Sequence, residues 1–181
     1  KGTGALYVRK GTRLGPILFG GHHERERRPG TENVAGLVGL GAAADLARRD
    51  LPAESRRLAA LRDHFEQALA ARIPFTGING LRAPRVPNTT NVYFDFLEGE
   101  AMVIALDLKG LAVSTGAACS SGSVEPSHVL TAIGLSDERA RSSIRFSLGR
   151  QNTAEQIAAL VEAAEAAAEH LRKLSPVFPA A

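Results

Sequence analysis

Hydrophobic and polar positions along the chain form two kinds of pattern, which predict two kinds of secondary structure. Short apolar or alternating stretches predict strands, at 4–9, 16–19, 89–96, 111–114 and 142–148. Longer stretches, most with apolar residues every three to four positions, predict helices, at 33–49, 53–72, 99–109, 127–133 and 154–173. Because helices and strands alternate, we expect an α/β or α+β class with a layered sheet.

Pro52 interrupts the helical pattern in the first third of the chain. Proline lacks the backbone N–H, and its ring clashes with the preceding helical turn. We therefore expect separate helices at 33–49 and 53–72. We place a domain boundary at the same point, between residues 1–51 and 52–181.

Other residues indicate how the helices begin, end and pack. Thr31 or Asn33 can cap the helix at 33–49, and Thr153 with Gln156 forms a capping box before the last helix. Gly134 can end the helix at 127–133 as its C′ residue. Glycine inside a helix costs about 1 kcal/mol relative to alanine. Three such glycines in the first helix predict that another backbone packs closely against it, at Gly36, Gly39 and Gly41.

Composition and charge exclude several classes of partner. The chain has 181 residues, of which 44% are hydrophobic, enough for one sizeable globular domain or a domain plus part of another. No apolar run is long enough to cross a bilayer, so we expect no membrane partner. The net charge of +3 is spread along the chain. The basic run at 25–28 is interrupted by Glu26 and lacks aromatic residues, so we expect no nucleic-acid partner.

Cys119 is the only cysteine, and it lies in a stretch of small and polar residues at 114–126. A single cysteine excludes an internal disulfide and suits a reducing compartment, so we expect a cytoplasmic protein. An exposed thiol on a flexible segment is a candidate nucleophile or sulfur carrier. The alternative is an incidental cysteine in a linker. A hydrolase pair of Cys119 with His23 or His128 stays open, although a protease nucleophile needs a rigid position.

Two further residues are candidate binding groups, and no set of residues indicates a metal site. Arg145 lies in the middle of an apolar strand, where a charge needs a partner because an isolated buried charge is very costly. It either pairs with a structural carboxylate or forms a bidentate fork for a ligand carboxylate or phosphate. Thr31 follows a glycine at a helix N-terminus, a position suited to binding phosphate. The five histidines are adjacent or scattered in sequence, so we expect no metal.

Several motifs together resemble one known family. They are G-G-H-H-E-R at 20–25, R-R-P-G-T-E-N at 27–33, P-N-T-T-N-V at 87–92, S-T-G-A-A-C-S-S-G-S-V-E-P at 114–126 and S-S-I-R-F-S-L-G-R at 142–150. On these motifs the chain resembles the C-terminal portion of a pyridoxal-phosphate-dependent cysteine desulfurase of the NifS/IscS type, group I, in the class V aminotransferase family. The resemblance extends over nearly the whole chain.

The resemblance implies a fold, a reaction and partners. The fold is the α/β pyridoxal-phosphate-dependent transferase fold type I, here the C-terminal end of the large domain plus the small C-terminal α+β domain. The reaction is removal of sulfur from L-cysteine to give L-alanine and an enzyme-bound persulfide. The partners are a second copy in a homodimer and a sulfur-acceptor or iron–sulfur scaffold protein, for iron–sulfur cluster assembly or other sulfur transfer.

The resemblance also implies roles for single residues. Cys119 matches the nucleophile that takes the sulfur, and Arg145 matches the arginine that holds the substrate carboxylate. Thr31 matches the threonine that reaches the cofactor phosphate of the other subunit. We expect 115–125 to be mobile, because a thiol that collects and delivers sulfur occupies at least two positions.

One departure from the family concerns the catalytic lysine. The family's Schiff-base lysine lies in an S-x-H-K segment a few residues before the point that matches Lys1. We therefore expect this chain to be the C-terminal part of a longer protein and inactive alone. The alternatives are a selenocysteine lyase on the same scaffold, and a sulfur-carrier or interaction module without pyridoxal phosphate.

Overall fold

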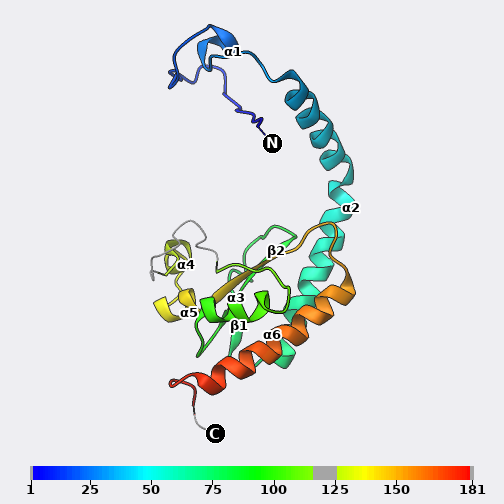
Figure 1. Ribbon diagram of the computed structural model, residues 1–181, viewed down its shortest axis with the longest axis vertical. Helices are drawn as coiled ribbons and strands as arrows, with labels where there is room; N and C mark the ends of the chain where they lie inside the picture. The colour runs from blue at the N-terminus through cyan, green and yellow to red at the C-terminus, as the bar shows by residue number, and fades with distance from the viewer. Residues whose placement is uncertain (1, 116–125, 180–181) are drawn as a thin grey trace. The chain divides into compact units, whose positions relative to one another are not determined.

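The computed structural model describes residues 2–115 and 126–179 (Figure 1). The chain divides into two compact units, Lys1–Pro52 and Ala53–Ala181. Of the helices in the described part, none combines the length and the apolar character that a membrane span requires.

The first unit holds the short helix α1 (His23–Glu26) and the start of α2 (Val34–Arg72). The strands predicted at 4–9 and 16–19 are wrong, because the structure has no β-pairing at either stretch. An extended segment becomes a strand only when another strand satisfies its backbone groups. The described residues of this unit contain no such neighbour.

Helix α2 runs through Pro52, so the prediction of two separate helices is wrong. Proline fixes φ near the helical value and removes a single N–H, which leaves the carbonyl of Arg48 without its usual partner. The turns on either side keep their own hydrogen bonds. The local cost at Pro52 therefore does not end the helix.

The glycines of α2 do not meet another backbone. A Cβ added at Gly36 would meet side-chain atoms of Thr3 and Asn33 at 2.5 and 2.6 Å, whereas one added at Gly39 or Gly41 would meet nothing within 4 Å. The prediction of close backbone packing is therefore wrong for the described residues. At Gly36 the close approach comes from side chains.

The second unit is built on a three-stranded antiparallel sheet in the order β1-β2-β3. Its strands are β1 (Thr76–Ile78), β2 (Thr89–Phe94) and β3 (Ser143–Ser147). The predicted strand at 111–114 is reduced to one isolated bridge, between Ser114 and Arg145. This bridge extends the sheet beyond β3 by a single residue pair.

Helices α2, α3 (Gly99–Asp107) and α6 (Ala154–Leu174) supply the apolar residues that pack against one face of this sheet. Figure 1 shows α3 and α6 beside the strands, with the short helices α4 (His128–Ala132) and α5 (Asp137–Arg141) near one end of them. The core is contributed by every layer, including Phe65, Leu69, Val92, Phe94, Met102, Leu106, Ile144, Phe146, Ile157 and Val161. The opposite sheet face is left to polar residues.

We expect Phe65→Ala to destabilise the second unit by about 3–5 kcal/mol, the usual cost of truncating a buried aromatic side chain. Phe65 is fully buried and meets the ring of Phe146 edge-on, with 4.8 Å between centroids. Denaturant unfolding of the full-length protein measures the change. The exposed Arg56 on the same helix gives the control Arg56→Ala, which should change stability by less than about 0.5 kcal/mol. Equal losses for the two variants would contradict this account of the core.

Candidate active site

Arg145 lies at the centre of β3 with its side chain on the sheet face opposite the core. Its neighbours Ile144 and Phe146 are buried, whereas Arg145 is exposed. Alternate residues of a strand point to opposite faces. The apolar sequence around Arg145 therefore does not bury its charge, which corrects the premise that this arginine needs a structural partner. Its guanidinium is presented on a polar surface.

The backbone of Arg145 is joined to the start of the Cys119 segment. Its N–H donates to the Ser114 carbonyl at 2.6 Å, and the Ser114 N–H donates to the Arg145 carbonyl at 3.3 Å. Cys119 itself lies outside the described residues, as do residues 116–125, and with them the predicted mobility of that segment. The structure thus places the residue pair 114–115, from which this segment departs, beside Arg145.

Gly99 packs against the same place. A Cβ at Gly99, the first residue of α3, would clash with the carbonyl oxygen of Arg141 and would lie 3.4 Å from the Thr115 side chain. Only glycine fits at this contact. The absence of a side chain lets the start of α3 and the end of α5 approach each other next to Thr115.

Asn91 is the partner of Arg145 on the neighbouring strand β2 and belongs to a hydrogen-bond network that is partly buried. Asn79 Nδ2 donates to Asn91 Oδ1 at 2.5 Å and to Ser143 Oγ at 2.9 Å. The Ser143 hydroxyl donates to the Arg139 carbonyl at 2.6 Å. Asn79 and Ser143 are buried, whereas Asn91 is half-buried, so the network is shielded from solvent at its Asn79 and Ser143 end. The sequence did not predict this network; the polar residues at alternate positions of β2 were the one available signal.

Arg139 is held by groups of this chain. Its Nε and Nη2 donate to the two carboxylate oxygens of Asp95 at 3.0 and 2.9 Å, and its guanidinium carbon lies 4.3 Å from the centroid of the Tyr93 ring. The hydrogen bond with Asp95 raises the pKa of Arg139. Arg139 is therefore a charged structural residue that fixes α5 against β2.

Thr31 lies in the first unit, exposed, after Gly30 at a positive φ of 101°. Asn33 is the residue that caps α2, since its Oδ1 accepts the Gly36 N–H at 3.0 Å. Arg28 Nη1 donates to the Gly30 carbonyl at 3.1 Å and braces the turn. Asn33, and not Thr31, therefore makes this cap, and the role of Thr31 toward a phosphate stays a prediction.

The histidines do not form part of a metal-ligand cluster in the described part of the chain. Among the described residues no three His, Cys, Asp or Glu side chains gather as metal ligands would. His22 Nδ1 lies 3.1 Å from Glu26 Oε1 on the surface of the first unit. His23 also belongs to that unit, and His128 begins α4. Their pairing with Cys119 remains a prediction.

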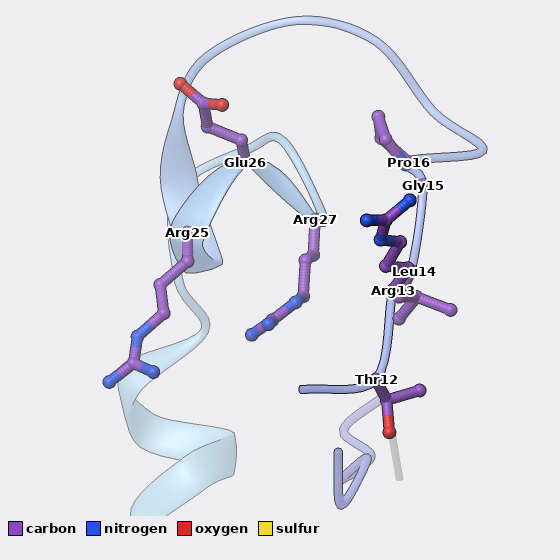
Figure 2. A pocket seen from close by; sticks show the side chains of 8 residues that line it. All are labelled: Thr12, Arg13, Leu14, Gly15, Pro16, Arg25, Glu26 and Arg27. Atoms are coloured by element: carbon purple, nitrogen blue, oxygen red, sulfur yellow. The ribbon is translucent and has the colours of Figure 1, made fainter. Parts of the chain in front are cut away.

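An open cavity of about 540 Å³ lies in the first unit (Figure 2). Its lining is wholly exposed and consists of Thr12, Arg13, Leu14, Gly15, Pro16, Arg25, Glu26 and Arg27. Figure 2 shows Arg27 extending into the space between the two segments, while Glu26 points away from it. Neither Thr31 nor Arg145, the candidate site residues that the structure describes, lines this cavity.

Comparisons with known proteins agree on one family. The model of the family described as aminotransferase class-V matches residues 1–160. A cysteine desulfurase of Nostoc sp. is 51% identical over 176 residues, which are 97% of this chain and 44% of that protein. The cysteine desulfurase NifS of Azotobacter vinelandii is 44% identical over 178 residues, 98% of this chain and 44% of that protein.

A solved structure gives the same result for the fold. The X-ray structure of a NifS-like protein from Rickettsia africae matches with a TM-score of 0.77 and 33% identity, covering 87% of this chain and 41% of that one. The chain thus has the fold of NifS-like proteins of class V. It spans less than half the length of these relatives.

Proposed function

We propose that this chain, which belongs to the aminotransferase class-V family, is the C-terminal part of a cysteine desulfurase. The complete enzyme removes sulfur from L-cysteine and leaves L-alanine and a persulfide. One observation carries the proposal: Arg145 presents its guanidinium on an exposed face and is hydrogen-bonded through its backbone to Ser114, where the Cys119 segment starts. This contact supports the proposal, because the proposed carboxylate-binding residue lies beside the start of the segment that carries Cys119.

Arg145 binds the carboxylate of the substrate in this proposal. A guanidinium offers two parallel N–H donors that match the two oxygens of a carboxylate. Because the residues of β3 that flank Arg145 are packed into the core, the base of its side chain is fixed. The fork holds the amino acid in one orientation.

Cys119 takes the sulfur. Four residues lie between Ser114 and Cys119, so the Cα of Cys119 can lie at most about 18 Å from that of Ser114. Its thiolate forms an S–S bond with the substrate sulfur as the Cβ–Sγ bond breaks. The electron pair left on Cβ takes up a proton, which gives alanine and a persulfide on Cys119.

Pyridoxal phosphate is the cofactor of this family, and it supplies the electron sink that weakens the Cβ–Sγ bond. Thr31 would donate to its phosphate, in line with the exposed hydroxyl after Gly30. We assign residues 1–51 to the end of the large cofactor-binding domain and residues 52–181 to the small domain.

The setting of the reaction follows from its chemistry. The single cysteine of this chain suits a reducing compartment, which supports a cytoplasmic enzyme. Thiols in such a compartment cleave a persulfide unless it is passed on quickly, which favours a protein sulfur acceptor. Iron–sulfur cluster assembly is the proposed use of the sulfur. We also propose a homodimer, in which Thr31 serves the cofactor of the other subunit.

The test is an assay of the full-length protein loaded with pyridoxal phosphate. We expect one alanine for each sulfur released from L-cysteine in the presence of a thiol. A much higher kcat/KM with L-selenocysteine and little activity with L-cysteine would instead identify a selenocysteine lyase. A full-length protein that binds no pyridoxal phosphate and makes no alanine would favour the sulfur-carrier module.

A further inference from the structure

We propose that Asn91 is a second donor to the substrate carboxylate, placed beside Arg145 and oriented by Asn79. The inference rests on the proposed role of Arg145. It adds to the site a neutral group from the neighbouring strand, so that recognition of the carboxylate uses both β2 and β3.

The register of the sheet puts the two side chains next to each other. Asn91 and Arg145 are direct partners in the antiparallel pairing of β2 with β3. The Leu148 N–H donates to the Asn88 carbonyl at 2.7 Å, so the pairs that exchange backbone hydrogen bonds are the alternate ones. Asn91 and Arg145 form a non-hydrogen-bonded pair, in which side chains are closest, with Cβ atoms roughly 4.5–5.5 Å apart.

The backbone groups of both residues form hydrogen bonds that point away from the β2–β3 pair. The Asn91 carbonyl accepts the Asn79 N–H at 2.8 Å, and Arg145 is bound to Ser114. Asn91 therefore has Asn79 on one side and Arg145 on the other. Which atom of its amide faces Arg145 decides whether it can assist a carboxylate.

The hydrogen-bond network settles this orientation. A carbonyl can only accept, so Ser143 must use its one hydroxyl proton on the Arg139 carbonyl. The Ser143 oxygen then accepts from Asn79, which requires the Nδ2 group of Asn79 at that contact. The same Nδ2 group donates to Asn91, so the atom of Asn91 that faces Asn79 is Oδ1.

The Nδ2 group of Asn91 is thereby left on the branch toward Arg145. A carboxylate held by the Arg145 fork keeps lone pairs that the fork does not use. The Asn91 amide can donate to one of them without adding charge. An aspartate at this position would do the opposite, because its carboxylate would occupy the guanidinium in place of the substrate.

The experiment measures the affinity of the full-length holoenzyme for two probes by calorimetry. L-Alanine, the proposed product, carries the carboxylate; L-alaninamide lacks it. We expect Asn91→Ala to weaken L-alanine binding about tenfold, as for loss of a hydrogen bond to a charged group. Asn91→Asp should weaken L-alanine binding roughly 100-fold, because the new carboxylate also occupies the Arg145 guanidinium in place of the ligand. Binding of L-alaninamide should stay within about twofold for Asn91→Ala.

Further variants control for folding and for the orienting network. Thr89→Val changes the same face of β2 two residues earlier and should affect neither probe. Asn79→Ala frees the Asn91 amide to rotate, so it should weaken the binding of L-alanine but not that of L-alaninamide. The effect should be smaller than that of Asn91→Ala. If Asn91→Ala destabilises the fold, Asn91→Ser provides the same comparison of the two probes with a smaller cavity.

The outcomes separate this inference from the proposed function. Suppose that Arg145→Lys weakens L-alanine binding selectively. The role of Asn91 would then be overturned if Asn91→Ala and Asn91→Ser weaken the binding of both probes equally, or of neither. If neither the Arg145 variant nor the Asn91 variants weaken L-alanine binding more than L-alaninamide binding, the carboxylate site as a whole would be overturned instead.

Discussion

Replacing Cys119 with serine in the full-length protein should abolish persulfide formation and reduce alanine production from L-cysteine to background. Serine has nearly the same size, but its hydroxyl is not ionised near neutral pH and its oxygen cannot carry the transferred sulfur as a thiol does. The loss should therefore affect the sulfur-transfer step alone. Incubation with ³⁵S-labelled cysteine, followed by non-reducing electrophoresis, measures the sulfur bound to the protein.

The control keeps the same segment and changes a neighbouring residue. Ser120→Ala should retain labelling close to that of the parent protein. The Cys119→Ser variant should also keep its affinity for L-alanine, because Arg145 and Asn91 belong to β3 and β2. Persulfide sulfur found on the Cys119→Ser variant would show that another residue takes the sulfur.

The local signals in the sequence predicted the second unit well. The capping box of Thr153 with Gln156 is confirmed, and α6 begins at Ala154, the residue after Thr153. Gly134 has a positive φ after α4, as a C′ glycine should. Strands β2 and β3 lie within the predicted stretches at 89–96 and 142–148. Each of these features depends on residues a few positions apart, so the sequence alone contains the information.

The errors arise where the structure depends on distant residues. The apolar stretch at 4–9 has strand-like composition, but no described strand pairs with it. Pro52 carries a local penalty that the helix on both sides outweighs. Strand β1 was missed because its three residues include a glycine and show no alternation. In each case the nearby residues indicate a local preference, whereas the secondary structure is decided by contacts with residues farther along the chain.

The candidate site divides in the same way. The role of Arg145 stays a prediction from its motif, and the expectation that its charge is buried was wrong because the alternation of β3 exposes it. Asn79 and Asn91 were missed because their roles depend on strand register, which places residues from three separate segments together. Thr31 and Cys119 stay predictions, since the structure does not place the first unit or residues 116–125 against Arg145.

Arg145→Lys provides the test of the carboxylate site itself. Lysine keeps the positive charge but replaces the planar fork with a single ammonium, which cannot form two parallel hydrogen bonds. Losing a charge-assisted hydrogen bond of about 1.5–3 kcal/mol should raise KM for L-cysteine roughly 10- to 150-fold. Steady-state kinetics of the full-length holoenzyme measures the change, with the exposed Arg82 supplying the control Arg82→Lys. An Arg145→Lys variant with the parent KM and kcat would mean that Arg145 serves the sheet through its backbone bridge to Ser114 and takes no part in binding cysteine.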